Sequence, residues 1–245
     1  MEWEAPAIVL DARNFGESDA IATVFAAEHG VFRGLARGGA SRAQAPVWQT
    51  GNLVQARWVA RLADQLGTLS AELVHPAAAL IMDDRLALAT LGAACALTAD
   101  ALPDRQPHPP VFTGLIEIVV ALARGAAPLP RLIEWEIMLL AELGYALDLT
   151  TCAVTGETEG LAWVSPRTGR AVSDAAAGLW REKLLPLPAF LRTGTPGTQS
   201  EWADGLRLTG HFLERNALGA LHRPLPLARR MLYDQVMDLA ITTRT

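Results

Sequence analysis

The chain has two cysteines, one lysine and no long hydrophobic run, and each shortage excludes a class of protein. Cys95 and Cys152 are too few and too far apart for the disulfide framework of a small secreted domain. The longest uncharged apolar stretch covers residues 86–99, whereas a membrane-spanning helix needs about 20 residues. The first four residues include two glutamates, unlike the basic start of a secretory signal. We therefore expect a cytoplasmic protein that does not span a membrane.

Catalytic and metal-binding motifs are also missing from the sequence. The five histidines are scattered, and none has a second histidine or a cysteine at the spacing of a metal site. There is no phosphate loop or dinucleotide fingerprint, and Lys183 is the one lysine that could act as a nucleophile. The carboxylate pairs at 83–84, 134/136 and 157/159 fit a helix start, a helix surface and a turn. We predict that the protein is not an enzyme and has no cofactor and no metal.

Positive charge, in contrast, is concentrated in one segment of the chain. The net charge is −5, and 51% of the 245 residues are hydrophobic, enough for a substantial core in one or two domains. Between Glu28 and Asp64, however, there is no acidic residue. Five arginines lie in that interval: Arg33, Arg37, Arg42, Arg57 and Arg61. With the nearby aromatic residues they have the composition of a groove that follows a phosphate backbone, although a solvated arginine-rich face has the same composition.

The same part of the chain has the alternating pattern of β-strands. From residue 7 to about residue 74, apolar residues recur with a period of two between short turns. Because side chains alternate across a strand, the arginines of segment 53–62 share one face, and so do those of segment 31–37. We expect the polar stretch between them to be a mobile loop that carries Arg42 and an exposed Trp48, which stacks a base. About five strands in such a short stretch predict a small closed barrel of the oligonucleotide-binding (OB) type.

After residue 76 the pattern becomes helical. Helices are expected at about 84–99, 111–124, 129–143 and from 200 to the end. Residues from about 146 to 176 break this pattern and predict a small β-hairpin lobe. The sequence thus predicts an α+β multidomain protein, with a five-stranded OB barrel in residues 1–78 and a helical domain in residues 79–245 that the lobe interrupts.

A second basic stretch lies near the C-terminal end, where no acid occurs between Glu214 and Asp234. Its arginines are Arg215, Arg223, Arg229 and Arg230. This stretch either extends a DNA-binding path or marks a helix end, where cations interact favourably with the helix dipole. The sequence leaves both interpretations open.

Several short motifs follow one another in a definite order. Near the N-terminus they are Glu17-Ser18-Asp19-Ala20, Phe25, Glu28-His29-Gly30, Gly34-Leu35-Ala36-Arg37-Gly38-Gly39 and Ser41-Arg42. In order and spacing they resemble the N-terminal barrel of the RecO family of bacterial DNA repair proteins. Residues 132–145 are similar to that family's central helix and residues 225–232 to its C-terminal helix. The resemblance therefore covers nearly the whole chain.

The resemblance implies an OB fold on a helical domain and a role in recombinational gap repair. The implied activities are binding of single- and double-stranded DNA, annealing of complementary strands, and action with RecR and single-strand-binding protein in loading the recombinase RecA. A nucleoid-associated location in the cytoplasm is implied as well. The family binds the C-terminal tail of single-strand-binding protein in an apolar pocket of the helical domain. The matching residues are Arg131, Leu132, Trp135 and Leu139, although the three apolar ones also fit an ordinary core.

The chain departs from the family pattern at two places. Many relatives hold zinc with two Cys-x-x-Cys pairs in the small lobe. At these four positions the chain has Cys152, Thr155, Ser173 and Ala176. One cysteine cannot supply four ligands, so we predict a lobe without zinc. Ala40 and Ala43 replace residues that are often basic in relatives, which predicts weaker DNA binding with a flatter salt dependence.

A function of a different class remains open on the sequence alone. The protein could be a structural adaptor that binds acidic partner tails through its helical domain, with the barrel serving only as a protein interface. Reversing the charge of Arg37 and Arg57 distinguishes the two functions, because it abolishes DNA binding in the first case and has no DNA binding to abolish in the second.

Overall fold

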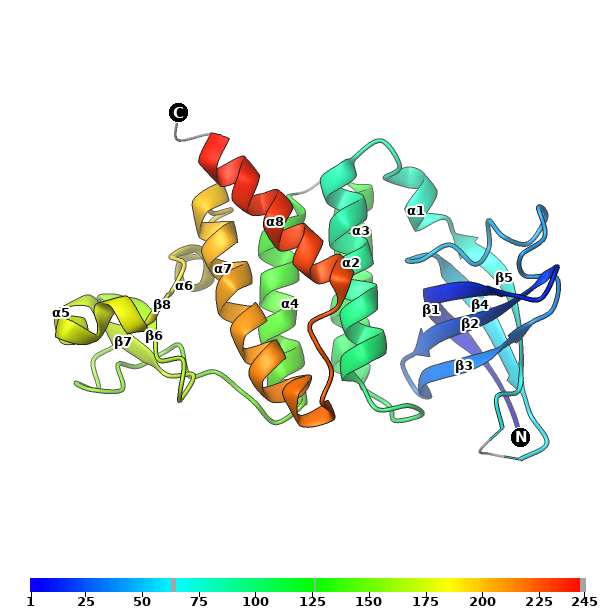
Figure 1. The fold of residues 1–245 in the computed structure, drawn as a ribbon, viewed down its shortest axis with the longest axis horizontal. Coiled ribbons are helices and arrows are strands. Elements are labelled where there is room, and N and C mark those ends of the chain that lie inside the picture. Colours follow the sequence, from blue (N-terminus) through cyan, green and yellow to red (C-terminus); the bar gives the residue numbers. More distant parts are fainter. Residues whose placement is uncertain (63–64, 126, 243–245) are drawn as a thin grey trace. The chain divides into compact units, whose positions relative to one another are not determined.

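Five N-terminal strands close into a barrel in the computed structural model, which describes residues 1–62, 65–125 and 127–242 (Figure 1). The strands are β1 (Glu2–Phe15), β2 (Asp19–Ala26), β3 (Gly30–Ala36), β4 (Leu53–Val59) and β5 (Thr68–His75). Their order around the barrel is β1-β2-β3-β5-β4, and every neighbouring pair is antiparallel except β3 and β5. This topology is that of an OB fold, so the barrel predicted from the alternating pattern is confirmed.

The first strand is long enough to pair with two neighbours. Residues 2–8 are antiparallel to β4, and residues 7–15 are antiparallel to β2. A bulge after Val9 shifts the register of β1 against β2. Because a bulge bends a strand and increases its twist, it helps the sheet to curl and close.

Inward-facing side chains fill the barrel. They include Val9, Ala22, Val24, Phe32, Val54, Ala56, Trp58 and Leu69, all of them buried. The indole nitrogen of Trp58 donates hydrogen bonds to the carbonyl oxygens of Arg33 (3.2 Å) and Leu66 (3.0 Å). Gly67 has a φ of +71°, and a Cβ atom there would lie 2.5 Å from the Trp58 ring. Glycine is therefore required where the chain passes this indole.

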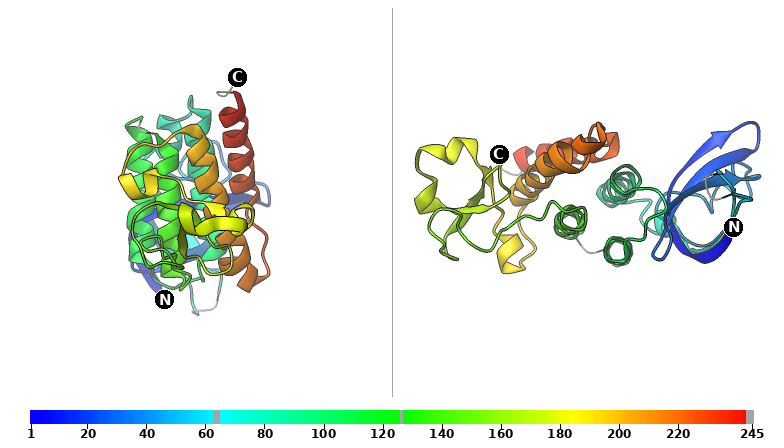
Figure 2. Two further views of the ribbon diagram at one scale, coloured as in Figure 1. Left: turned by 90° about the vertical axis from the view of Figure 1, so that its left-hand side faces the viewer. Right: turned by 90° about the horizontal axis from the view of Figure 1, so that it is seen from below.

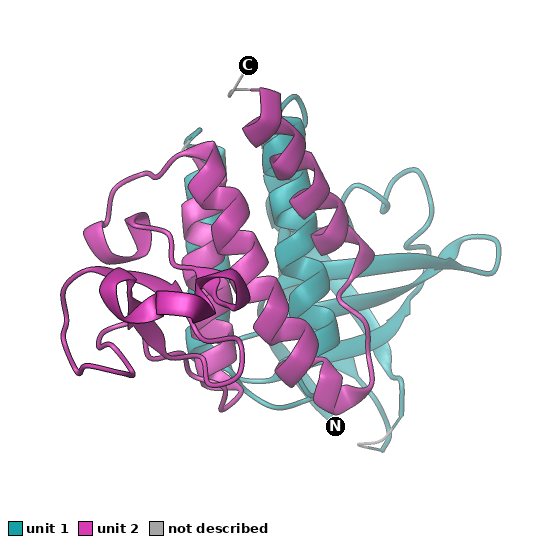
Figure 3. Cartoon of the chain, turned by 60° about the vertical axis from the view of Figure 1, so that its left-hand side comes forward, with its two compact units in different colours: residues 1–126 teal, residues 127–245 magenta. Residues whose placement is uncertain are grey.

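Helices complete the first compact unit, residues 1–126 (Figure 3). They are α1 (Ala77–Leu80), α2 (Arg85–Ala101) and α3 (Pro109–Ala123). The carboxylate of Asp84 accepts hydrogen bonds from the backbone nitrogens of Leu86 and Ala87, both at 2.9 Å, and so caps α2. The helix start predicted at residues 83–84 is thus confirmed. The long helix α2 contacts β1, so the unit extends beyond the residues 1–78 expected for the barrel domain.

The second unit, residues 127–245, is built around three long helices. These are α4 (Pro128–Glu142), α7 (Gln199–Phe212) and α8 (Leu227–Thr242). Helix α7 contacts both of the others, and it begins with a capping box between Thr198 and Glu201. A π-helical turn, η2 (Leu213–Ala217), and a 3₁₀ turn, η3 (Gly219–Leu221), follow α7. Within the described residues, no helix is both long and apolar enough to cross a membrane.

A small lobe lies beside α7, as the two views in Figure 2 show. Its elements are β6 (Leu161–Val164), β7 (Ala171–Ser173), α5 (Asp174–Ala177), η1 (Gly178–Lys183), β8 (Leu185–Pro186) and α6 (Phe190–Thr193). The strands form a three-stranded sheet in the order β7-β6-β8. The antiparallel pair β6 and β7 is the hairpin predicted from the sequence.

Candidate nucleic-acid interface

The alternation along β3 and β4 directs arginines to the outside of the barrel. In β4 the inward side chains are buried, whereas the Arg57 side chain is 53% exposed. In β3 the same alternation leaves the Arg33 side chain 40% exposed. Arg37 and Arg61 lie just beyond the ends of the two strands and are exposed. The predicted pairs of arginines on common strand faces are therefore consistent with the burial pattern.

One strand, β5, separates the two strands that carry arginines. Arg57 of β4 pairs with Ser70 of β5, and Leu35 of β3 pairs with Thr68 of β5. Arg33 and Arg57 therefore lie on the two strands that flank β5, and Arg37 lies in the turn that follows β3.

Two of the five arginines form ion pairs with acids from distant parts of the sequence. Arg33 Nη1 lies 3.1 Å from Asp104 Oδ2, and Arg57 Nε lies 2.7 Å from Glu2 Oε1. All four side chains are at least 40% exposed. Exposed pairs of this kind contribute only about 0–1 kcal/mol, so a phosphate group can replace either acid. The segment that lacks acids in the sequence is thus partly neutralised in the fold.

The other three arginines have no acidic partner among the described residues. Arg37, Arg42 and Arg61 are all exposed. The backbone next to Arg37 is held in place, because the nitrogen of Gly38 donates a 2.7 Å hydrogen bond to Asp19 Oδ1. Within the part of the chain that the structure describes, these three guanidinium groups are available to bind an anion.

The loop that carries Arg42 is anchored to the barrel. The nitrogen of Ala40 donates to the carbonyl oxygen of Ser18 (2.9 Å), in the turn between β1 and β2. The side-chain nitrogen of Asn52 donates to the carbonyl oxygens of Pro46 (2.8 Å) and Val47 (3.3 Å). Asn52 is itself fully buried. The loop is therefore hydrogen-bonded to the β1–β2 turn at one end and to Asn52, directly before β4, at the other.

Trp48 is buried, and the expectation that it is exposed was wrong. The residue is 5% exposed and belongs to the cluster that fills the barrel. The loop's polar composition predicted a solvated segment, but the indole provides a large apolar surface that is more stable inside the core. Trp48 is consequently not a surface on which a base can stack.

Arg105 is a barrel arginine that the sequence pattern did not identify. It lies in the proline-rich connector between α2 and α3, and its backbone nitrogen donates to the carbonyl oxygen of Val31 (2.9 Å). Its Cζ atom is 5.3 Å from the ring centres of both Phe32 and Trp58, and its Nη2 donates to the carbonyl oxygen of Gln65 (2.8 Å). Nothing local in the sequence indicates this docking, because the partners are about 40 to 75 residues away.

The second basic stretch is divided by the fold of the second unit. Arg215, Arg223 and Arg230 are exposed, but Arg229 is completely buried. The Arg229 guanidinium donates to both carboxylate oxygens of Glu136, with Nε 2.5 Å from Oε1 and Nη2 3.0 Å from Oε2. Arg229 is therefore a core ion-pair residue, and its inclusion in a DNA-binding patch was wrong.

The three apolar residues predicted to line a partner-tail pocket are core residues instead. Leu132, Trp135 and Leu139 are 0%, 3% and 0% exposed. Arg131, on the surface of the same helix, forms an ion pair with Glu134 (3.5 Å). The spacing of the apolar residues was read correctly as one helix face, but that face packs inside the unit. The tail-pocket prediction at these positions was wrong.

The family's zinc position in the small lobe is occupied by a hydrogen-bonded cluster. The nitrogen of Ser173 donates to Cys152 Sγ (3.3 Å), and the Ser173 hydroxyl lies 3.5 Å from the same sulfur. Burial raises the pKa of the Cys152 thiol, but hydrogen bonds from Ser173 and Thr155 outweigh burial and lower the pKa to about 6. One thiol and two hydroxyls do not fit a structural zinc site, which needs four strong ligands. The described residues contain no group of three or more potential metal ligands.

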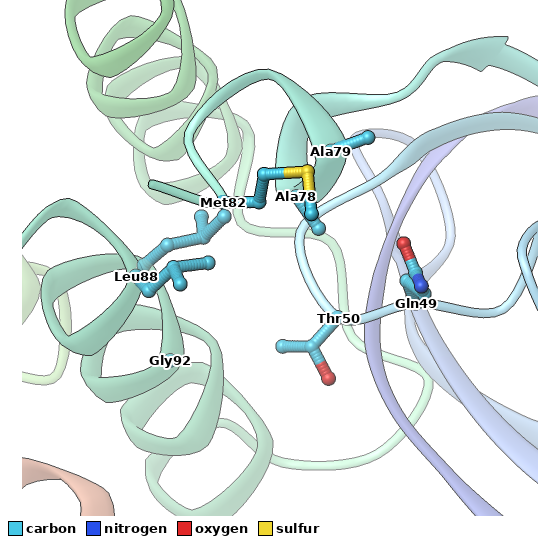
Figure 4. Close-up of a pocket in the computed structure, with 8 residues that line it drawn as sticks. Gln49, Thr50, Ala78, Ala79, Met82, Leu88 and Gly92 are labelled. Carbon is cyan, nitrogen blue, oxygen red and sulfur yellow. The ribbon is translucent and has the colours of Figure 1, made fainter. Parts of the chain in front are cut away.

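An apolar pocket of about 400 Å³ also lies in the first unit (Figure 4). It is lined by Gln49, Thr50, Ala78, Ala79, Met82, Leu88, Leu91 and Gly92. Figure 4 shows Met82 and Leu88 on the helical side of this space and Thr50 on the loop side. No charged side chain lines it, so the pocket is unsuited to phosphate.

Comparisons with known proteins give matches to two consecutive parts of the chain. The family model described as "Recombination protein O N terminal" matches residues 1–77, and "Recombination protein O C terminal" matches residues 82–224. The "DNA repair protein RecO" of Granulibacter bethesdensis is 55% identical over 100% of this chain and 99% of its own length. The proteins of the same name from Gluconacetobacter diazotrophicus and Acidiphilium cryptum are 54% and 55% identical, each over 96% of this chain and 95% and 96% of their own lengths.

Proposed function

The chain belongs to the RecO family of DNA repair proteins, and on this premise we propose that it binds single- and double-stranded DNA through its barrel arginines and anneals complementary strands. In this proposal it acts with RecR and single-strand-binding protein to load RecA. The protein provides binding surfaces rather than catalysis. The observation that supports this function best is a set of three exposed guanidinium groups, those of Arg37, Arg42 and Arg61, which have no acidic partner among the described residues of the first unit.

Arginine suits this function for chemical reasons. Its planar guanidinium group binds phosphate through two parallel hydrogen bonds, and it remains charged at every physiological pH. Contacts to phosphate are independent of base sequence, and they leave the base edges free to pair with a second strand. A protein that anneals arbitrary complementary strands needs both properties.

The two ion-paired arginines can also bind phosphate, once they separate from their acidic partners. When a phosphate approaches, Arg33 can release Asp104 and Arg57 can release Glu2, since each pair is exposed and weak. Binding would then involve up to five phosphate contacts on the barrel, and each contact would release a counterion from DNA. The affinity is therefore expected to fall steeply as salt increases.

The partner-binding surface belongs to the second unit in this proposal. A groove of about 540 Å³ is lined by residues of α7 and α8. Its lining combines apolar Leu225 and Met231 with basic Arg207 and Arg230, and it also includes acidic Glu214 and Asp234. In this proposal the aromatic end of an acidic peptide, such as the tail of single-strand-binding protein, packs on the apolar residues, and its carboxylates pair with Arg207 and Arg230. Fluorescence polarisation of such a labelled peptide, with Arg230→Glu as the variant, tests this assignment.

Titration of a fluorescein-labelled single-stranded oligonucleotide by anisotropy, at several salt concentrations, tests the DNA-binding function. The test variant is Arg37→Glu/Arg57→Glu. The control is Arg85→Glu/Arg124→Glu, which makes the same charge change at exposed positions on α2 and at the end of α3. We expect tight, salt-sensitive binding by the natural chain and the control, and loss of binding in the test variant.

Two results would overturn the proposal. If the natural chain does not bind DNA even at low salt, the adaptor function becomes the better interpretation, with the barrel as a protein interface. If the control loses binding as completely as the test variant, net charge rather than the barrel arginines determines the affinity.

A further inference from the structure

The first unit has one exposed aromatic side chain among its described tryptophan, tyrosine and phenylalanine residues. That residue is Phe15, which is 55% exposed. Trp48 and Trp58 are buried in the barrel, and Trp3 stacks on His29 with ring centres 4.7 Å apart. Phe15 is the last residue of β1, directly before the turn to β2. Residues 13–18 are all exposed, so this hairpin tip extends into solvent.

The hairpin tip is linked to the segment that carries the unpaired arginines. Phe15 pairs with Asp19 across the hairpin, and Asp19 accepts the hydrogen bond from the nitrogen of Gly38, next to Arg37. The nitrogen of Ala40 donates to Ser18 in the turn itself. Two independent hydrogen bonds thus hold residues 38–40 against the residues that follow Phe15. The exposed ring and the free cations of Arg37 and Arg42 belong to one end of the barrel.

The charges at the tip favour a base rather than a phosphate. Asp19 accepts the hydrogen bond from Gly38, and Asp11 is paired with Arg13 at 2.7 Å, but Glu17 in the turn is exposed and has no partner of opposite charge among the described residues. A free carboxylate repels a phosphate, yet it can accept a hydrogen bond from a base amino group. An aromatic ring beside it offers a face for stacking. The arginine segment is suited to the backbone and the hairpin tip to an unpaired base.

We propose that Phe15 is the residue on which an unpaired base of single-stranded DNA stacks while Arg37 and Arg42 bind the neighbouring phosphates. This inference rests on the proposed DNA-binding function and adds a preference for unpaired bases at the hairpin tip. In a duplex the bases are already stacked on one another, so stacking on the Phe15 ring adds little to the affinity for a duplex. Phe15 is therefore a determinant of strand preference.

The test compares Phe15→Leu, which keeps an apolar side chain, with Phe15→Trp, which keeps an aromatic ring. Leu80→Ala is the matched control, because Leu80 is 57% exposed in α1 of the same unit. The probes are a single-stranded oligonucleotide containing 2-aminopurine, whose fluorescence is quenched by stacking, and a duplex of the same length. Since one stacked base is lost, we expect Phe15→Leu to weaken single-strand binding by about fivefold or more and to reduce the quenching. Phe15→Trp and Leu80→Ala should match the natural chain, and duplex binding should change less than single-strand binding.

The outcomes separate this inference from the function on which it rests. If the natural chain binds DNA and Arg37→Glu/Arg57→Glu does not, but Phe15→Leu binds the single strand normally, the stacking role is wrong and the DNA-binding function stands. Equal losses in Phe15→Leu and Phe15→Trp would also overturn the stacking role. Absence of DNA binding by the natural chain overturns both.

Discussion

Glu136 and Arg229 form a buried ion pair that joins α4 to α8. Their side chains are 0% and 1% exposed, and two hydrogen bonds connect them. The hydroxyl of Thr209 in α7 also donates to Glu136, so all three long helices of the second unit meet at one carboxylate. A buried charge of this kind is costly when its partner is removed. The pair therefore determines how the three helices fit together.

Removing one member of this pair should destabilise the protein far more than removing both. We expect Arg229→Met to lower the free energy of unfolding by about 3–5 kcal/mol, because the Glu136 carboxylate is left without its partner. Arg229→Met/Glu136→Leu should recover most of this loss, and Thr209 retains the carbonyl oxygen of Gly205 as acceptor (3.1 Å). Urea denaturation followed by circular dichroism measures both. A single variant within about 1 kcal/mol of the natural chain would contradict the assigned role.

Each unpaired barrel arginine should contribute to the salt dependence of DNA binding. Replacing Arg37 or Arg61 by glutamine should reduce the slope of log Kd against log salt by about 0.7 for a single strand, since one phosphate contact is lost. The measurement is anisotropy at four or more salt concentrations. A slope that stays unchanged while Kd rises would mean that the arginine acts on folding rather than on phosphate.

The acids that pair with barrel arginines should oppose DNA binding. We expect Glu2→Gln and Asp104→Asn each to tighten DNA binding, by up to about fivefold, because each variant frees one guanidinium group from an exposed ion pair. The effect should be larger at low salt, where charge interactions are screened least. Weaker binding by both variants would show that these ion pairs orient the arginines for phosphate.

Trp48 should affect stability rather than DNA contact. Its burial in the barrel cluster predicts that Trp48→Ala lowers the free energy of unfolding by about 3–5 kcal/mol, with a smaller loss for Trp48→Phe. At a temperature where Trp48→Phe is folded, its DNA affinity should equal that of the natural chain. A normal unfolding curve combined with a loss of DNA affinity would restore the earlier expectation of a stacking role.

The ionisation of Cys152 should make stability depend on pH. The pKa of this thiol is lowered from its ordinary value of 9.0 to about 6 in the folded chain. Between those two values the folded state has lost a proton that the unfolded state still holds, so the free energy of unfolding rises with pH across this window. The contribution is complete above pH 9 and is lost as the pH falls through 6.

Thermal unfolding of Cys152→Ala and the natural chain at several pH values measures this effect. The difference between the two should grow from pH 6 to pH 9. Cys95→Ala is the control, because burial raises the pKa of the Cys95 thiol to about 12 and keeps it protonated in this window. Parallel pH profiles for both variants would exclude an ionised Cys152.

The barrel could be predicted because the sequence patterns that determine its strands are local. Alternation in segments 31–37 and 53–62 determines which side chains are buried, and the same alternation requires Arg33 and Arg57 to face outward. The capped start of α2 and the hairpin of the lobe were predicted by short patterns of the same kind. Such features depend on a few neighbouring residues, and so they can be recognised in one sequence.

The errors concern contacts between residues that are distant in sequence. The residues that surround Arg229 in the sequence are basic, but its ion-pair partner Glu136 is 93 residues away. Likewise, the sequence of the acid-free segment does not reveal that two of its arginines form ion pairs with Glu2 and Asp104 in the folded chain. Trp48 and Trp135 were selected from the sequence as candidate binding residues. Whether these side chains are exposed depends on the distant residues that pack against them. Apolar spacing alone cannot distinguish a pocket from a core.

The segment between α2 and α3 packs against the barrel, and this limits where the chain can be cut into folded fragments. Asp104 forms a bridge with Val31, and Arg105 covers Phe32 and Trp58, although both residues come from the segment after α2. At Gly30 a Cβ atom would lie 2.1 Å from the carbonyl oxygen of Gln106, so the strand is shaped to receive this segment. A fragment cut after residue 78 would expose two core rings and an unpaired strand edge. The smallest fragment that contains the barrel and folds on its own should therefore end near residue 125, after α3.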